Sequence, residues 1–281
     1  MEINGIILVN KESGFSSNQV VGKVKYLLKA NKAGHLGTLD VLGRGLLPIT
    51  LGRGTKLFDY FLNKDKVYQT IFEFGFATTT LDREGEITDK NDVEVSLEQL
   101  QNVCQKFIGK QDQLPPIYSA KKINGKKAYE LARAGKSVDL KPKQIEIYDL
   151  KVLKQIEKNK FLLEVHCSSG TYIRSLCRDI ASSLGTFGVM QDILRTKCGS
   201  FDIKESFTIE NIEQGKYKII PLDTVFDYEK LITYEADKLL NGQLVNTDYQ
   251  DGIYRIYTDN YLFLGIGNVK NKRLKLDMRL I

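Results

Sequence analysis

"AGHLGTLDVLGRGLLPITLG", residues 33–52, is the stretch that decides the fold, because it places one carboxylate, Asp40, among five glycines and six leucines. It has the period of neither a helix nor a strand, so we expect an irregular loop. The glycines permit backbone angles that other residues avoid, and the leucines indicate a loop packed inside the protein. A carboxylate buried there needs a partner. The stretch is therefore either a closed functional pocket or a buried turn in which Asp40 caps the next segment.

The whole chain has the composition of an ordinary globular protein, with 42% hydrophobic and 27% charged residues over 281 positions. This length allows one large domain and a small one, or two medium ones. We find no apolar run of the roughly 18 residues that a membrane span needs and no pattern of a signal peptide. We therefore expect a cytoplasmic protein that does not contact membranes, and a monomer as the default.

The residues that usually carry metal or cofactor chemistry are sparse. The four cysteines form no C-x-x-C pair, and His35 and His166 are the only histidines, so no metal site is expected. The sequence has neither a G-x-G-x-x-G motif nor a P-loop, so no nucleotide cofactor is expected. Neither histidine lies in the sequence context of a catalytic triad. Asp40 remains as the reactive group, and a carboxylate acts as a nucleophile or a general base without a cofactor.

Positive charge is concentrated in one segment. Residues 121–143 contain eight Lys or Arg and two acidic residues, a net charge of +6 that equals the net charge of the entire chain. Lysines 23, 25, 29 and 32 add further charge before the glycine-rich stretch. Such clustering favours a polyphosphate partner. A solvated lysine-rich surface is the alternative.

The remaining pattern predicts an α+β protein with a mixed or antiparallel sheet, because the spacing of parallel β-α-β units is absent. Helices are expected after Ser17, after the capping box of Ser96 and Gln99, around 126–134 and over 172–184. Residues 190–201 are interpreted as a short basic segment. Strands are expected at 5–9, 66–77, 143–153 and 160–170, and again after 227, where short alternating strands suggest a small β domain.

The residues around Asp40 closely resemble the G-H-x-G-x-L-D-P-x-A-x-G-x-L signature of TruB-type pseudouridine synthases, which act on uridine 55 in the T-loop of tRNA. Four further blocks resemble this family in the same order, over roughly residues 3 to 200. They are GIILVNKESGFSSNQVVGKVK (5–25), DKVYQTIFEFGFATTTLDREGE (65–86), PPIYSAKKINGKKAYELAR (115–133) and CSSGTYIRSLCRDI (167–180).

The resemblance implies a pseudouridine-synthase fold and an isomerisation that needs no cofactor. The enzyme detaches uracil from its ribose, rotates it and rejoins it through C5. The implied organisation is a catalytic domain over 1–226 with a basic thumb insertion at about 110–143, and a small C-terminal β domain over 227–281 that is PUA-like and RNA-binding. The implied partner is the T-arm stem-loop of tRNA, with no protein partner required.

Residue by residue, Asp40 matches the catalytic aspartate, whether it attacks ribose C1′ or uracil C6. Tyr68 matches the tyrosine that stacks on the flipped uracil. Arg174 is expected to pair with Asp40 and keep it ionised, with Asp82 as a second carboxylate on that arginine. On this interpretation the glycines let the backbone approach a bound ribose, and the leucines keep the carboxylate dry.

Three further positions match the family with less specific roles. Tyr172 is expected to line the pocket beside Arg174, and His35 to contact the RNA where nucleotides have flipped out. Lys122 matches the lysine that follows the tyrosine-serine-alanine motif.

The chain departs from the family pattern beside the aspartate. Val41 stands where the family usually has proline, and Leu36 and Gly43 replace the usual threonine and alanine. Without the proline the turn is less rigid by itself, so activity is lower or packing around Val41 compensates. Two alternatives stay open. One is a non-catalytic tRNA-binding protein or folding chaperone, and the other is the catalytic subunit of a guide-RNA complex.

Overall fold

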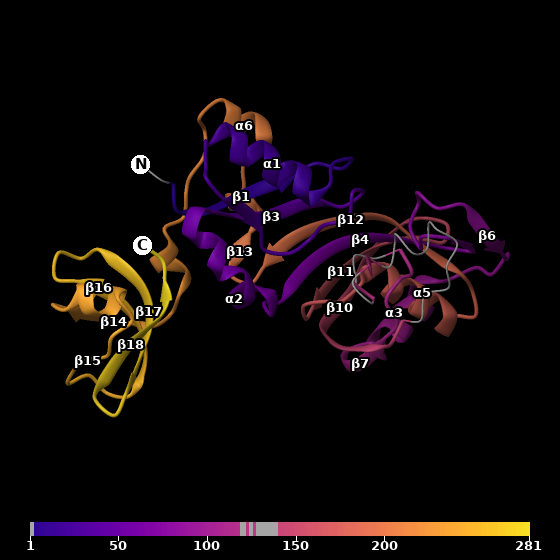
Figure 1. The fold of residues 1–281 in the computed structure, drawn as a ribbon. Coiled ribbons are helices and arrows are strands. Elements are labelled where there is room, and N and C mark those ends of the chain that lie inside the picture. The colour runs from indigo at the N-terminus through magenta and orange to yellow at the C-terminus, as the bar shows by residue number, and fades with distance from the viewer. Residues whose placement is uncertain (1–2, 119–121, 124–125, 128–139) are drawn as a thin grey trace.

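A nine-stranded sheet forms the centre of the described part of the protein (Figure 1). The computed structural model describes residues 3–118, 122–123, 126–127 and 140–281. The strand order is β1-β3-β12-β4-β11-β10-β7, with β2 paired to β3 and β13 to β12. These strands are β1 (Gly5–Lys11), β2 (Ala33–His35), β3 (Arg44–Leu51), β4 (Lys66–Phe74), β7 (Gly109–Gln113), β10 (Lys143–Glu157), β11 (Lys160–Cys167), β12 (Gly188–Cys198) and β13 (Phe201–Asp202).

The sheet is mixed, which confirms the predicted fold class. Among the described strands, β3 and β12 run parallel and the other neighbours in this sheet run antiparallel. On β4 the residues alternate between buried and half-buried, so one face of the sheet carries the core. Two short hairpins lie outside the sheet: β5 (Phe76–Thr78) with β6 (Ile87–Lys90), and β8 (Lys122–Ile123) with β9 (Lys126–Lys127).

Three helices share the core of the sheet: α1 (Ser17–Leu27), α3 (Leu97–Gln105) and α5 (Ile173–Ser183). Helix α1 begins with a capping box of Ser16 and Gln19, one residue before the predicted cap, because the Ser16 hydroxyl accepts from Gln19 N–H. The predicted box of Ser96 and Gln99 is present at α3. Shorter helices are α2 (Phe58–Leu62), α6 (Ile209–Glu213) and α7 (Ala236–Leu240), with 3₁₀ turns at Gly52–Leu57, Ile203–Glu205 and Leu222–Val225.

Several sequence predictions for the strands of the central sheet are wrong. Residues 33–52 are not all loop, since β2 and β3 occupy both ends of the stretch. Residues 190–201 hold most of the long central strand β12, whose charged residues hid its strand pattern. The strand expected at 66–77 ends at Phe74, because Gly75 adopts a φ of 108° that breaks the pleat.

The thumb insertion expected at about 110–143 lies partly outside the described residues. The structure describes its two ends and the short β8–β9 hairpin. Of the helix expected around 126–134, Lys126–Lys127 form β9 instead, and residues 128–134 lie outside the described part.

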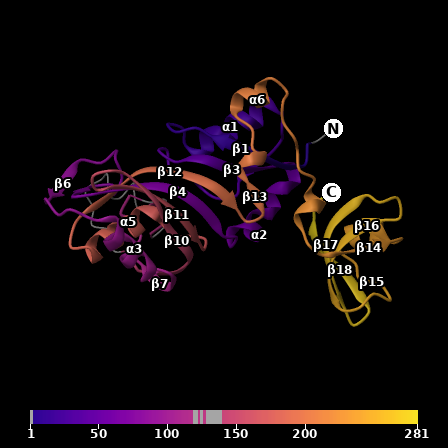
Figure 2. The same cartoon turned by 180° about the vertical axis from the view of Figure 1, so that it is seen from behind.

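A second sheet occupies the C-terminal end, as expected, far from α3 and α5 in both side views (Figures 1 and 2). Its strand order is β14-β16-β17-β18-β15, and a small core lies beneath it. A further cluster joins it to the main body, with Ile266 and Leu280 packing in the same cluster as Ile6 and Leu8. The strands are β14 (Glu229–Thr233), β15 (Val245–Asn246), β16 (Gly252–Thr258), β17 (Phe263–Lys270) and β18 (Arg273–Arg279).

The exact domain boundary after residue 226 stays a prediction. Phe226 packs in the cluster that joins the two parts. None of the helices in the described ranges is long and apolar enough to cross a membrane.

The close approach of β3 to β12 predicts contrasting effects of two glycine substitutions. Gly45 has a φ of 100°, and a Cβ there would lie 2.5 Å from the Arg195 carbonyl oxygen, so Gly45→Ala should destabilise the fold by about 2 kcal/mol or more. Gly22 on α1 has nothing within 4 Å of such a Cβ, so Gly22→Ala should stabilise by about 1 kcal/mol. Thermal unfolding of both variants checks this. Equal melting temperatures would contradict the close approach at Gly45.

Candidate active site

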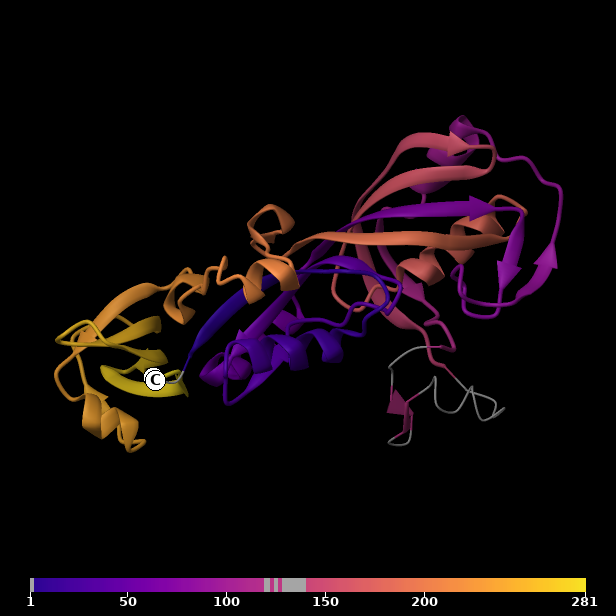
Figure 3. The same cartoon turned by 90° about the horizontal axis from the view of Figure 1, so that it is seen from above.

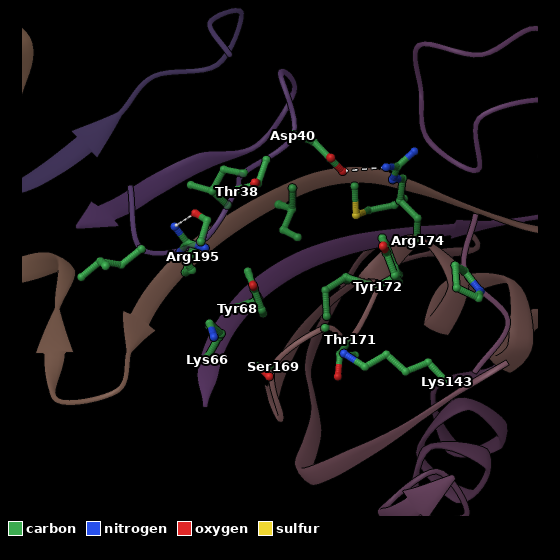
Figure 4. Close-up of a pocket in the computed structure, with 18 of the residues that line it drawn as sticks. Thr38, Asp40, Lys66, Tyr68, Lys143, Ser169, Thr171, Tyr172, Arg174 and Arg195 are labelled. Atoms are coloured by element: carbon green, nitrogen blue, oxygen red, sulfur yellow. Dashed lines mark hydrogen bonds and ion pairs between the residues drawn. The ribbon is translucent and has the colours of Figure 1, made fainter. Parts of the chain in front are cut away.

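A pocket of about 550 Å³ opens where the loop before β3 faces β4 and the start of α5 (Figure 4; Figure 3 shows the sheet from above). Asp40 comes from the loop, Tyr68 from β4, and Tyr172 and Arg174 from the start of α5. Four of the residues expected to form the site therefore line one pocket. The described part of its lining includes one carboxylate, Asp40, and four cations, Lys66, Lys143, Arg174 and Arg195.

The loop that carries Asp40 is a hydrogen-bonded turn. Gly43 N–H donates to the Asp40 carbonyl at 3.0 Å, which makes residues 40–43 a β-turn. The Ser17 hydroxyl donates to the Leu39 carbonyl at 2.9 Å and accepts from Leu39 N–H at 2.8 Å. Gly14 N–H donates to the Val41 carbonyl at 2.9 Å. The start of α1 and the turn before it therefore fix the loop by hydrogen bonds.

Lys11 adds a buried cation to this arrangement. Its ammonium donates to the carbonyls of Glu12 at 2.9 Å, Val41 at 3.3 Å and Gly43. Burial lowers the pKa of Lys11 to about 8, and the nearby Asp40 opposes that shift. Lys11 was not predicted as a site residue, although it stands in the first block that resembles the family.

Arg174 holds the pocket together through four acceptors. Its guanidinium lies 3.0 Å from the Asp40 carboxylate and 3.3 Å from that of Asp82. It also donates to the carbonyls of Thr80 at 3.0 Å and Tyr118 at 3.1 Å. The Arg174 side chain is 7% exposed, so all four contacts compensate a buried charge. Both carboxylates predicted to pair with Arg174 do so.

The Asp40 carboxylate is not shielded from solvent by the leucines, contrary to the expectation. The Asp40 side chain is 47% exposed at the pocket mouth. The leucines point elsewhere: Leu39 and Leu42 pack in the main core, and Leu36 packs in the cluster shared with the C-terminal sheet. The carboxylate is therefore oriented by Arg174 and the turn rather than by apolar surroundings.

The glycines of the loop serve packing within the protein. Gly45 makes room for the Arg195 backbone, and a Cβ at Gly43 would lie 3.3 Å from the Asp40 carbonyl oxygen. This accounts for both glycines without a bound ribose.

The wall opposite Arg174 is formed by Tyr68 and Arg195. Tyr68 is 9% exposed, and burial raises the pKa of its phenol, while Arg195 opposes that shift. Arg195 is buried and donates to the carbonyls of Leu46 at 2.7 Å and Gly37 at 3.0 Å. No sequence pattern indicated this role for Arg195, because it lies in the stretch interpreted as a short basic segment. Lys197 and Cys198 end β12, and a two-residue turn leads to Phe201 at the start of β13.

The other predicted residues lie around the pocket. Asp82 stands behind Arg174 and is buried. His35, on β2, is absent from the described pocket lining, and its Nδ1 is buried without a hydrogen-bond partner in the described part of the chain. Burial, and then Arg195, lower the pKa of His35. Lys122 lies on β8, and its side chain is outside what the structure describes.

Across the described ranges, no group of three or more His, Cys, Asp or Glu side chains is placed to hold a metal ion. The four cysteines are free and buried. The polar groups in the described lining of the pocket are thus one carboxylate, four cations, two phenols, one amide and three hydroxyls.

Family models cover most of the chain. Residues 25–173 match the N-terminal domain of the TruB family pseudouridylate synthases. Residues 174–227 match the tRNA pseudouridylate synthase B C-terminal domain, and residues 230–275 match the pseudouridine synthase II TruB C-terminal region.

Curated relatives extend over nearly the whole length. The tRNA pseudouridine synthase B of Caldanaerobacter subterraneus subsp. tengcongensis is 38% identical over 280 residues, which is 98% of each chain. That of Stutzerimonas stutzeri is 38% identical over 294 residues, covering 100% of this chain and 96% of the relative. A solved structure of an H/ACA RNP bound to a substrate RNA containing 2′-deoxyuridine has a similar fold, with a TM-score of 0.71 over 99% of this chain and 85% of that one, at 19% identity.

The family models and the curated relatives make this chain a pseudouridine synthase, an RNA-modifying isomerase. The chain belongs to the TruB family of pseudouridylate synthases, which confirms the resemblance seen in the sequence.

The turn geometry predicts that the missing proline is tolerated and can be restored. Val41 is the second residue of the turn, where proline is favoured, and its side chain is 45% exposed. Its N–H donates no hydrogen bond to any residue in the described ranges. Val41→Pro should therefore stabilise the fold by about 0.5 kcal/mol and leave turnover equal or higher. Denaturant unfolding and turnover rates check this, and a clear loss of stability would contradict the turn assignment.

The buried ammonium of Lys11 predicts a pH-dependent stability. The folded protein loses this proton near pH 8, and the unfolded chain loses it near 10.5. Between these values the unfolded state binds more protons, so stability rises with pH. The free energy of unfolding of the wild type should therefore rise relative to Lys11→Met from pH 8 to 10. Parallel pH profiles of the two proteins would show that Lys11 keeps its ordinary pKa.

Proposed function

We propose that the protein isomerises uridine 55 to pseudouridine in the T-loop of tRNA, as a stand-alone enzyme without a cofactor. The observation that carries the proposal is the ion pair of Asp40 and Arg174 at 3.0 Å in a pocket that also presents Tyr68. The curated relatives are named tRNA pseudouridine synthase B, which supports tRNA as the substrate. We further propose that it acts in the cytoplasm, as a monomer that needs no protein partner.

Asp40 is proposed to open the glycosidic bond. In the reaction the bond between uracil N1 and ribose C1′ breaks, and a bond between C5 and C1′ forms. A proton leaves C5 and one is gained at N1, so the isomerisation balances without an oxidant or reductant. Asp40 attacks C1′ or C6, and Arg174 holds the carboxylate in a fixed direction for either step.

The other pocket residues are proposed to receive the flipped base. A uridine reaches Asp40 only when it leaves the base stack, and an aromatic face offsets part of that cost. Tyr68 is proposed to provide that face, with Tyr172 beside it. Asp82 is proposed to act through Arg174, which it contacts at 3.3 Å. His35 and Lys122 are proposed to bind RNA outside the uracil pocket.

The surrounding parts are proposed to hold the rest of the tRNA. The basic segment 121–143 is proposed as a thumb that grips the T-arm by phosphate contacts. The C-terminal part, 227–281, is proposed as a PUA-like RNA-binding domain joined to a catalytic domain over 1–226.

The decisive experiment incubates the protein with an unmodified T-arm stem-loop, without guide RNA, partner protein or added cofactor, and maps pseudouridine. Wild type should convert position 55. Asp40→Asn should lower turnover at least about 100-fold while RNA binding persists, because the carboxylate acts on the reacting base. Arg174→Lys should lower it about tenfold or more, since lysine cannot reproduce the fork of contacts.

The matched control is Asp192→Asn, which removes a carboxylate from the ion pair with Arg44 outside the pocket. This variant should retain wild-type turnover. Turnover by Asp40→Asn would reject the role of Asp40, and conversion only in the presence of a guide RNA would reject the stand-alone enzyme.

A further inference from the structure

One cation of the pocket has no partner within the described part of the protein. Arg174 is compensated by two carboxylates, Arg195 donates to two carbonyls, and Lys66 donates to the Lys64 carbonyl at 2.5 Å. Lys143, at the start of β10, makes neither a hydrogen bond nor an ion pair with any described residue. Its ammonium is therefore available to a ligand.

The fold directs Lys143 into the pocket. Its side chain crosses the backbone of Gly170, so that a Cβ at Gly170 would lie 2.2 Å from the Lys143 Nζ. Gly170 has a φ of 79°, which disfavours any larger residue there. Figure 4 shows the amine extended toward Thr171 and Ser169 on the pocket wall.

Hydroxyl groups complete this corner of the pocket. The Ser169 hydroxyl has no hydrogen-bond partner in the described ranges, so it can donate to a ligand. The Thr171 hydroxyl donates to the Ser168 carbonyl at 2.9 Å, so its proton is already used within the protein. An ammonium beside a free hydroxyl donor matches an oxyanion, and no carboxylate in the described lining lies on this side of the pocket to compete with one.

We propose that Lys143 and Ser169 bind a backbone phosphate of the substrate strand next to the flipped uridine. This proposal rests on the proposed function and deepens it. A uridine that enters the pocket carries a phosphate on each side, and the pocket of about 550 Å³ has room for more than a pyrimidine ring. Of the cations in the described lining, Lys143 is the one that makes no hydrogen bond or ion pair to the described protein, so all of its donors are available to such a group.

The first test measures steady-state kinetics on the T-arm stem-loop over a range of KCl concentrations. Lys143→Ala and Lys143→Gln should raise KM about tenfold with little change in kcat, since a charged contact is lost. The slope of log(kcat/KM) against log[KCl] should become shallower by about 0.7, the value for one phosphate contact with single-stranded nucleic acid. Lys143→Arg should keep the wild-type slope.

The matched control is Lys151→Ala. Lys151 lies on the same strand, outside the pocket lining, with its ammonium 2.5 Å from the Asp149 carboxylate. Its loss should change neither KM nor the salt slope. Because Lys143 and Lys151 are both exposed, thermal unfolding should be unchanged in every variant.

The second test locates the phosphate. Stem-loops in which single linkages around the target are replaced by an uncharged methylphosphonate are compared in wild type and Lys143→Ala. At one linkage, the methylphosphonate should lower kcat/KM of the wild type about as much as Lys143→Ala does. The same replacement should cause no further loss of kcat/KM in Lys143→Ala. Additive effects at every linkage, or a loss confined to kcat with an unchanged salt slope, would overturn the proposal.

The two proposals fail separately. If wild type does not convert the unmodified stem-loop, the proposed function fails. Binding of the same stem-loops measured by fluorescence anisotropy, with the same variants and salt series, then still decides whether Lys143 contacts a phosphate.

Discussion

The buried guanidinium of Arg174 is the constraint on which the site depends. A charge with a side chain only 7% exposed must be compensated, and its four acceptors come from three segments far apart in the sequence. Asp40 belongs to the loop before β3, Thr80 and Asp82 to the loop between β5 and β6, and Tyr118 to the segment after β7. Satisfying one side chain therefore fixes three loops at once, and none can shift without leaving a buried charge underpaired.

The sequence predicted this pairing, but not the way in which Asp40 is held. The blocks around Asp40, Asp82 and Arg174 identified the family, and the mixed sheet followed from the absence of parallel units. Burial was misjudged because leucines beside an aspartate say nothing about which way each side chain points. Leu39 and Leu42 lie on either side of Asp40 at a tight turn. Their side chains pack in the core, while the Asp40 carboxylate stays half-exposed.

Strand β12 shows a second limit of the sequence. Asp192, Arg195 and Lys197 make it resemble a surface segment, yet it lies in the middle of the sheet. Arg195 is tolerated there because the Leu46 and Gly37 carbonyls accept from its guanidinium. Those acceptors exist only after β3 and the loop before it have folded beside β12, so no local pattern could reveal them.

The exposure of Asp40 bears on how the proposed reaction selects its substrate. A half-exposed carboxylate is hydrated in the free protein, and water weakens its effect on a reacting atom. A base entering beside Tyr68 would displace that water, because it fills the same pocket. The full electrostatic strength of the Asp40–Arg174 pair would then develop only around a nucleotide extruded from its stack. In the proposed reaction, reactivity would thereby depend on RNA shape. A uridine that stays stacked would meet a solvated carboxylate, and one that flips would meet a desolvated one.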